Sequence, residues 1–193
     1  MDYKEEFMQL LDQNRLEDAR ILLEQHQLYA TEEPFYYGNM GWILNHMERY
    51  QEAEIYLRKG LVYFPEDGWM YSQLGFSLDR QGESDDGLKA LEKALELGFD
   101  EPWLHGEIGW CYKQQGNFEK AITYFENGLM DDTRNVWLLS QAAEAYYHAG
   151  DKKTAEDYYL KSYHILPDED ARFDLARFYK ACGEYDKEIN ILQ

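Results

Sequence analysis

Histidine and cysteine, the side chains that most often carry catalysis or bind metals, are few and scattered in this chain. The five histidines are His26, His46, His105, His148 and His164. None has a second histidine four residues away, the spacing at which one helix presents two metal ligands. Cys111 and Cys182 lack the spacing of a metal or redox motif, and no phosphate-binding glycine loop is present. We therefore expect neither an enzyme nor a metal or cofactor site.

Aromatic side chains follow a more regular pattern. The first aromatic column, whose members recur at one constant spacing, is Phe35, Trp69, Trp103 and Trp137. The second aromatic column, seven residues later, is Trp42, Phe76, Trp110 and Glu144. On a helical wheel of about 100° per residue, Trp103 and Trp110 lie together, roughly opposite Ile108, Gly109 and Tyr112. These tryptophans therefore point away from the apparent core.

Small residues with the same period indicate the elements that position the aromatic columns. One set is Gly41, Gly75, Gly109 and Ala143, and another is Ala19, Ala53, Gly87, Ala121 and Ala155. A glycine inside a helix costs about 1 kcal/mol relative to alanine, and close packing of a partner helix would offset that cost. Residues that tolerate a left-handed conformation lie between the two sets, at Asn14, Gly82, Gly116, Gly150 and Gly183, with Glu48 as the exception. Each unit should therefore be two helices joined by a tight turn.

This pattern resembles the tetratricopeptide repeat family, whose signature W-x2-L-G-x2-Y…A-x3-F…P extends over about 34 residues. The resemblance implies an all-α fold, a right-handed α-solenoid of antiparallel helix pairs, in a single solenoid domain. The expected units are a degenerate first repeat at 1–33, repeats at 34–67, 68–101, 102–135 and 136–168, and an incomplete last repeat at 169–193. The apolar finish at Ile189, Ile191 and Leu192 indicates a fragment of a longer chain or an end-to-end self-associating surface, and we favour the fragment.

Charge and hydropathy limit the possible partners. The 193 residues include 38 Asp and Glu against 19 Lys and Arg, a net charge of −19 that disfavours nucleic acid and anionic membranes. The N-terminus lacks the features of a signal peptide, and no apolar run is long enough to span a bilayer. The composition therefore predicts a cytoplasmic protein for which a basic partner is permitted.

The resemblance also suggests where a ligand would bind, because the first helix of each repeat in that family lines a concave groove. The predicted peptide-binding residues are Phe35, Trp42, Trp69, Phe76, Trp103, Trp110, Trp137 and Tyr147. An acidic rim is predicted at Glu32, Glu33, Glu66, Asp67, Asp100, Glu101, Asp168 and Glu169, although these carboxylates also suit helix N-termini. The expected partner is a protein or peptide segment with apolar anchors and Lys or Arg.

A structural role for the same rings is the alternative, since they could pack between neighbouring first helices. Gly38, Ser72, Gly106 and Ser140 lie one turn after the first aromatic column and leave room beside the rings. Gly106→Ala should therefore be tolerated or stabilising.

The family's carboxylate clamp, which holds the C-terminus of heat-shock chaperones with Lys, Asn and Arg, is absent. The corresponding positions hold Gly38, Trp42, Gln73, Trp103 and Glu107. A peptide-binding scaffold is the leading function; a secretion-type chaperone and a structural spacer of a larger protein are the alternatives.

Overall fold

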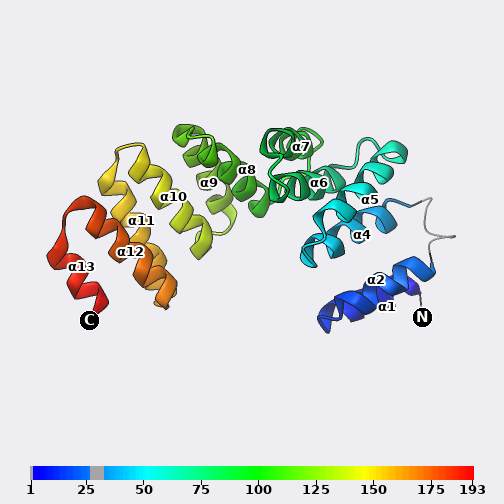
Figure 1. Cartoon of the computed structure of the whole chain (residues 1–193), viewed down its shortest axis with the longest axis horizontal. Coiled ribbons are helices and arrows are strands. Elements are labelled where there is room, and N and C mark those ends of the chain that lie inside the picture. Colours follow the sequence, from blue (N-terminus) through cyan, green and yellow to red (C-terminus); the bar gives the residue numbers. More distant parts are fainter. Residues whose placement is uncertain (1, 27–32) are drawn as a thin grey trace. The chain divides into compact units, whose positions relative to one another are not determined.

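Helices make up all the regular secondary structure that the computed structural model describes, which covers residues 2–26 and 33–193. Contacts divide the chain into two compact units, Met1–Asp100 and Glu101–Gln193. Unit 1 contains α1 (Tyr3–Asp12), α2 (Leu16–Gln25), α4 (Pro34–His46), α5 (Tyr50–Tyr63), α6 (Gly68–Arg80) and α7 (Ser84–Glu96). Unit 2 contains α8 (Pro102–Gln114), α9 (Phe118–Asp131), α10 (Val136–His148), α11 (Lys152–Ile165), α12 (Glu169–Cys182) and α13 (Tyr185–Leu192) (Figure 1). The predicted all-α fold of helix pairs is confirmed.

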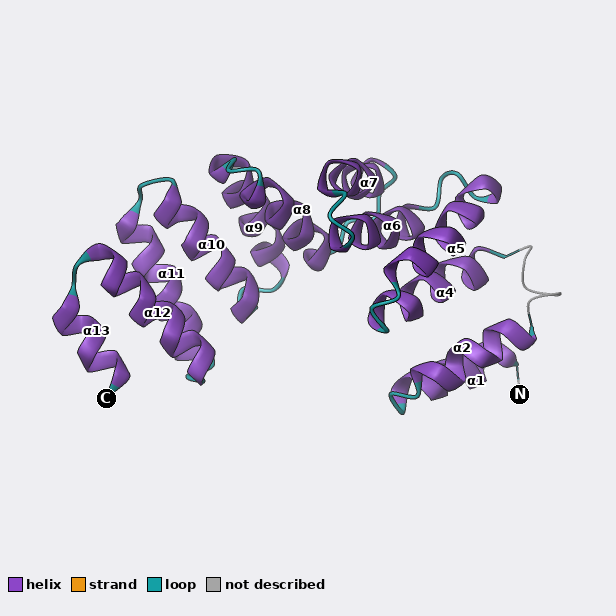
Figure 2. Cartoon of the chain, in the orientation of Figure 1, coloured by secondary structure: helices purple, strands orange, loops and turns teal. Residues whose placement is uncertain are grey.

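Short turns join the two helices of each pair, as Figure 2 shows for α6 and α7 or α10 and α11. Gly82, Gly116, Gly150 and Gly183 have φ angles between 75° and 94°, the left-handed region in which glycine carries no steric penalty. Asn14 and Glu48 occupy the equivalent turns with φ angles of 55° and 59°. The predicted turn positions are therefore confirmed, including the exception at Glu48.

The small residues allow the two helices of a pair to approach closely. A Cβ added at Gly75 in α6 would lie 2.8 Å from the carbonyl oxygen of Gly87 in α7 and 2.6 Å from Leu91. A Cβ at Gly109 would lie 2.7 Å from the ring of Phe125. Neither position has space for a side chain. The close helix packing that these glycines allow offsets the cost of placing glycine in the middle of a helix.

Acidic residues begin several of the first helices. The Asp67 carboxylate accepts a hydrogen bond from the backbone N–H of Met70 at 2.8 Å, and Asp168 accepts one from Ala171 at 2.9 Å. Glu33 and Glu101 occupy the cap position without such a bond, and each is followed by a proline at the first helical position. Residues 27–32 of the first expected unit, including Glu32 of the predicted rim, lie outside the described residues.

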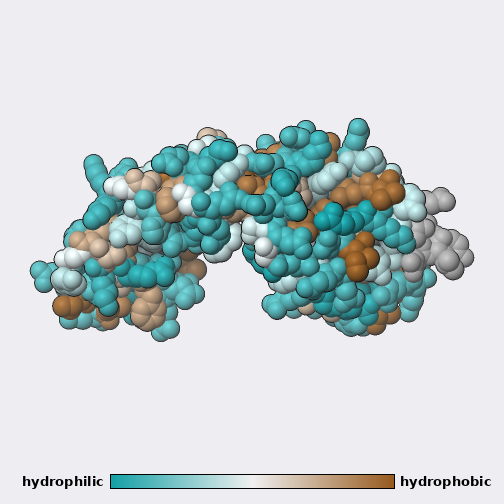
Figure 3. Space-filling view, turned by 45° about the horizontal axis from the view of Figure 1, so that its top comes forward, coloured by the Kyte–Doolittle hydropathy of each residue, from teal (hydrophilic) through white to brown (hydrophobic). Residues whose placement is uncertain are grey.

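Buried apolar side chains form a core within each unit. The core of unit 1 includes Phe7, Leu23, Tyr37, Leu57 and Met70. In unit 2, one cluster joins α10, α11 and α12 through residues such as Ala143, Tyr159 and Leu175. The face shown in Figure 3 is mostly hydrophilic, with separate hydrophobic patches. In the described part of the chain, no helix has the length and apolar character needed to cross a bilayer. The unit boundaries proposed from the sequence, and their joining into one solenoid domain, remain predictions.

Candidate functional site

The first aromatic column begins with rings that pack on the preceding helix pair of unit 1. A Cβ added at Gly38 in α4 would lie 2.3 Å from Cζ3 of Trp69, the tryptophan near the start of α6. Phe35 meets Phe7 of α1 edge to face, with ring centroids 5.4 Å apart. Both rings are half-buried and fill space between neighbouring repeats.

The same packing recurs in unit 2. A Cβ at Gly106 in α8 would lie 2.6 Å from Cζ3 of Trp137 and 2.9 Å from Leu138. Trp137 also meets Phe125 of α9 edge to face at 6.4 Å, although 41% of its surface remains exposed. The expectation that Gly106→Ala would be tolerated is therefore wrong, because the next tryptophan of the first aromatic column fills the room beside the glycine. Trp103 is half-buried in the first turn of α8.

Rings of the second aromatic column are half-buried, and each is covered by a polar side chain of its own helix. The Trp42 and His46 ring centroids lie 3.9 Å apart in α4. The Arg80 guanidinium lies 4.5 Å from the Phe76 ring centroid, and Lys113 Nζ lies 4.4 Å from that of Trp110. Cation–π contacts that we expected from a partner are thus made within the chain at two of these positions.

Glu144, the non-aromatic member of the second aromatic column, binds the lysine that covers Trp110. The Lys113 ammonium donates to the carboxylate of Glu144 and, at 2.6 Å, to Oε1 of Gln141. The Lys113 side chain is only 8% exposed, so these contacts in α10 neutralise a cation that would otherwise be costly to bury. The sequence pattern did not single out Lys113.

An uncharged link occupies the equivalent place in unit 1. Asn45 Nδ2 donates to the backbone carbonyl of Gln73 at 3.0 Å, and the Ser77 hydroxyl donates to Asn45 Oδ1 at 2.6 Å. All three residues are buried, and they join α4 to α6 as Lys113 joins α8 to α10. Polar side chains therefore fix the first helices of adjacent repeats beside the second aromatic column.

Tyr147, the last of the predicted binding residues, lines a cavity of about 260 Å³ formed by α10, α11 and α12. The Tyr147 and Phe178 rings meet edge to face at 5.8 Å, and the Tyr159 and Phe178 centroids are 5.3 Å apart. The remaining lining residues are Glu144, His148, Arg177 and Ala181. We call this cavity the Tyr147 pocket.

Charged groups at the Tyr147 pocket are mostly paired. Arg177 donates to Asp174 at 2.9 Å, and Glu144 binds Lys113. Burial raises the pKa of the Tyr159 phenol, with the nearby Glu144 carboxylate acting in the same direction. The pocket therefore offers neutral aromatic walls with polar groups at its edge.

Sequence reasoning placed Tyr147 in the binding set but missed Phe178 and Arg177. Phe178 lies one repeat period after Glu144, so extending the second aromatic column by one more repeat would have found it. Arg177 follows no repeated pattern and only the packing of α12 brings it to the pocket. Among residues 2–26 and 33–193, no group of three His, Cys, Asp or Glu side chains is arranged to hold a metal ion.

Comparisons with known proteins identify the repeat and the fold. A tetratricopeptide repeat family model matches residues 36–66 and 104–130. Among curated proteins, none matches the chain significantly. The solved structure of PilW, described as a widely conserved type IV pilus biogenesis factor, superimposes with a TM-score of 0.87 at 17% identity, over 98% of this chain and 88% of that chain.

Two further solved structures show the same fold. PilF of Pseudomonas aeruginosa gives a TM-score of 0.82 at 16% identity, over 98% of this chain and 86% of that chain. YrrB, described as a TPR protein with an unusual peptide-binding site, gives 0.69 at 22% identity, over 88% of this chain and 87% of that chain.

Proposed function

We propose that this chain, a tetratricopeptide repeat protein, is a scaffold that binds a protein or peptide segment at the Tyr147 pocket and at Trp110, the tryptophan of the second aromatic column in the same unit. Repeats of this kind support protein interaction as the general role, and one similar structure is described as peptide-binding. The observation that carries the proposal is the Tyr147 pocket, a hollow with aromatic walls that includes the predicted binding residue Tyr147.

The size and lining of the pocket suit a single apolar or aromatic side chain of a partner. Its volume of about 260 Å³ is small compared with the sites of drug-sized ligands, which occupy roughly 300–1,000 Å³. Aromatic walls supply contact area at low entropic cost, and tyrosine is among the residues enriched at binding hot spots. An anchoring side chain in this pocket would leave the flanking partner residues on α10 and α12.

The charge of the chain favours a basic flank on that partner. A net charge of −19 attracts Lys-rich or Arg-rich segments and repels acidic ones during diffusional encounter. Arg80 and Lys113 already lie over the Phe76 and Trp110 rings. We therefore expect the Trp110 ring to contribute apolar contact area to partner binding rather than cation–π attraction. For the first aromatic column, the contacts of Phe35, Trp69 and Trp137 favour a structural role.

The test fills the pocket without removing any packing. Ala181 is exposed at the pocket rim on α12, so Ala181→Leu adds volume into the hollow and keeps a good helix former. Peptides are first selected on the wild-type chain from a displayed random library, and their affinities are then measured by calorimetry. We expect Ala181→Leu to weaken the selected peptides at least about tenfold, because an occupied pocket excludes the anchor.

Asn190→Leu is the matched control, since it adds the same side chain at an exposed position of α13 outside the pocket. The control should bind like the wild type, and both variants should keep the wild-type melting temperature. Unchanged affinity in Ala181→Leu would show that the Tyr147 pocket is not the binding site.

A further inference from the structure

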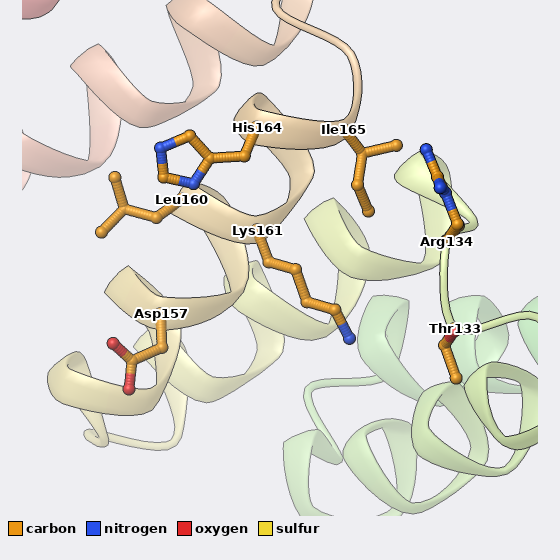
Figure 4. A pocket seen from close by; sticks show the side chains of 7 residues that line it. All are labelled: Thr133, Arg134, Asp157, Leu160, Lys161, His164 and Ile165. Carbon is orange, nitrogen blue, oxygen red and sulfur yellow. The ribbon is translucent and has the colours of Figure 1, made fainter.

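A second hollow in unit 2 lies between α11 and the loop that joins α9 to α10. Its volume is about 510 Å³, and it is open to solvent. The lining consists of Thr133 and Arg134 of the loop and Asp157, Leu160, Lys161, His164 and Ile165 of α11 (Figure 4). None of these residues belongs to the aromatic columns or to the Tyr147 pocket. We call this hollow the Lys161 pocket.

Lys161 does not pair with the carboxylate placed to receive it. Asp157 precedes Lys161 by four residues on α11, the spacing at which acid–base pairs commonly form on a helix surface. No ion pair joins them; Figure 4 shows the Lys161 amine extended away from Asp157, toward the loop that carries Thr133 and Arg134. The Lys161 cation therefore faces the hollow.

Arg134 is a second cation for which the described residues provide no carboxylate partner. Asp132 lies two residues away, but its carboxylate accepts a hydrogen bond from the backbone N–H of Arg134 at 3.2 Å. In the described part of the chain, the guanidinium makes neither a hydrogen bond nor an ion pair. Many other cations are paired, as Arg20, Arg58 and Lys89 illustrate. Lys161 and Arg134 thus bring two cations to the lining of one hollow in a protein of net charge −19.

Leu160 and Ile165 add apolar side chains to the lining, Leu160 beside His164 and Ile165 on the side of Arg134 in Figure 4. Both are partly buried, and His164 lies at the opposite edge from Arg134 in Figure 4. The volume is within the range of roughly 300–1,000 Å³ that small ligands and side chains occupy. An anionic group on an apolar stem would match both the charges and the walls.

We propose that the Lys161 pocket binds a carboxylate presented by a protein segment, with an apolar neighbouring side chain against Ile165. The strongly negative chain repels polyanions such as nucleic acids over its whole surface, whereas one carboxylate is attracted locally by Lys161 and Arg134. This site lies on residues other than those of the proposed peptide-binding site and does not depend on it.

The test uses the full chain and a defined probe with a single carboxylate, the dipeptide N-acetyl-leucyl-glutamate α-amide. Nuclear magnetic resonance titration should give saturable shifts of the Arg134, Lys161 and Ile165 signals, and the neutral N-acetyl-leucyl-glutamine amide should not. We expect Arg134→Gln and Lys161→Gln each to weaken the dipeptide about two- to fivefold, as for solvent-exposed ion pairs. Raising the salt concentration should weaken it further.

Lys153→Gln is the matched control, because it removes an exposed cation of α11 that does not line the pocket. It should bind the dipeptide within twofold of the wild type. Equal shifts with the neutral amide, unchanged affinity in Lys161→Gln, or an equal loss in Lys153→Gln would overturn the proposal. Inorganic phosphate that binds as tightly as the dipeptide would also overturn it, because the apolar contact with Ile165 would then contribute nothing.

Discussion

At the scale of single residues, the pairing of a glycine with a tryptophan one repeat later explains the most distinctive sequence pattern. Trp69 covers Gly38 and Trp137 covers Gly106, so each small residue is the contact surface for a large one. We expected open space beside these small residues on a binding face. Instead, each glycine and tryptophan pack densely between the first helices of neighbouring repeats. These tryptophans contribute their apolar area to stability.

The Gly38–Trp69 pair can be tested by a double-mutant cycle. Gly38→Ala should destabilise the protein by about 1–3 kcal/mol, because its Cβ would lie 2.3 Å from the Trp69 ring. In a Trp69→Ala background the same change should be neutral or stabilising by up to about 1 kcal/mol, the helix-propensity advantage of alanine. Urea denaturation measures both values. Equal costs in the two backgrounds would mean that the ring is not what excludes the side chain.

At the scale of elements, the turn inside each helix pair needs a left-handed residue, and its identity varies. Gly82 and Gly116 adopt φ angles of 85° and 75° without strain. Glu48 adopts 59° in the equivalent turn between α4 and α5, a conformation that costs an ordinary residue roughly 1 kcal/mol or more. The α4–α5 pair therefore carries local backbone strain that the α6–α7 pair lacks.

Exchanging the turn residues should change stability in opposite directions. Glu48→Gly should stabilise the chain by up to about 1 kcal/mol, because it relieves the strain and Glu48 is exposed. Gly82→Ala should destabilise it by about 1–2 kcal/mol through the positive φ alone, because no atom lies within 4 Å of the added Cβ. Thermal denaturation of both variants provides the measurement. A destabilised Glu48→Gly would show that the glutamate side chain has a role that outweighs the strain.

At the scale of the whole molecule, buried tyrosines distributed over both units link folding to alkaline pH. Burial raises the pKa of Tyr36, Tyr146 and Tyr159, and raises that of Tyr179 to about 12. A tyrosine in the unfolded chain ionises near pH 10. The contribution of these phenols to stability is therefore fully present below about pH 10, and is lost as the pH rises through the folded values.

Alkaline titration should consequently show two phases of phenolate absorbance. Accessible tyrosines should ionise in the first phase, at the lower pH, with the helices intact. The buried tyrosines should ionise at higher pH together with loss of helicity, because each phenolate adds to a net charge of −19. Far-ultraviolet circular dichroism at constant ionic strength follows the helicity. Tyr179→Phe should reduce the amplitude of the second phase only. A single transition near pH 10 that leaves the helicity intact would contradict this expectation.

The sequence by itself determined the helix pairs and their turns. The repeat period places Gly41, Gly75 and Gly109 at close helix contacts and Gly82 and Gly116 at left-handed turns, because these conformations and distances exclude larger residues. Local constraints of this kind act within a pair and can be read without the tertiary structure. The resemblance to the tetratricopeptide repeat family follows from the same spacing.

Only the tertiary structure decided what each aromatic ring contacts. The helical wheel shows that Trp103 and Trp110 leave the core of their own pair, but it cannot show whether a neighbouring repeat covers such a face. Packing between repeats placed Trp137 over Gly106 and left the Tyr147 pocket beside Phe178. The pairing of Lys113 with Glu144 and the direction of the Lys161 amine away from Asp157 depend on side-chain direction and on distances between helices, which a repeat period does not specify.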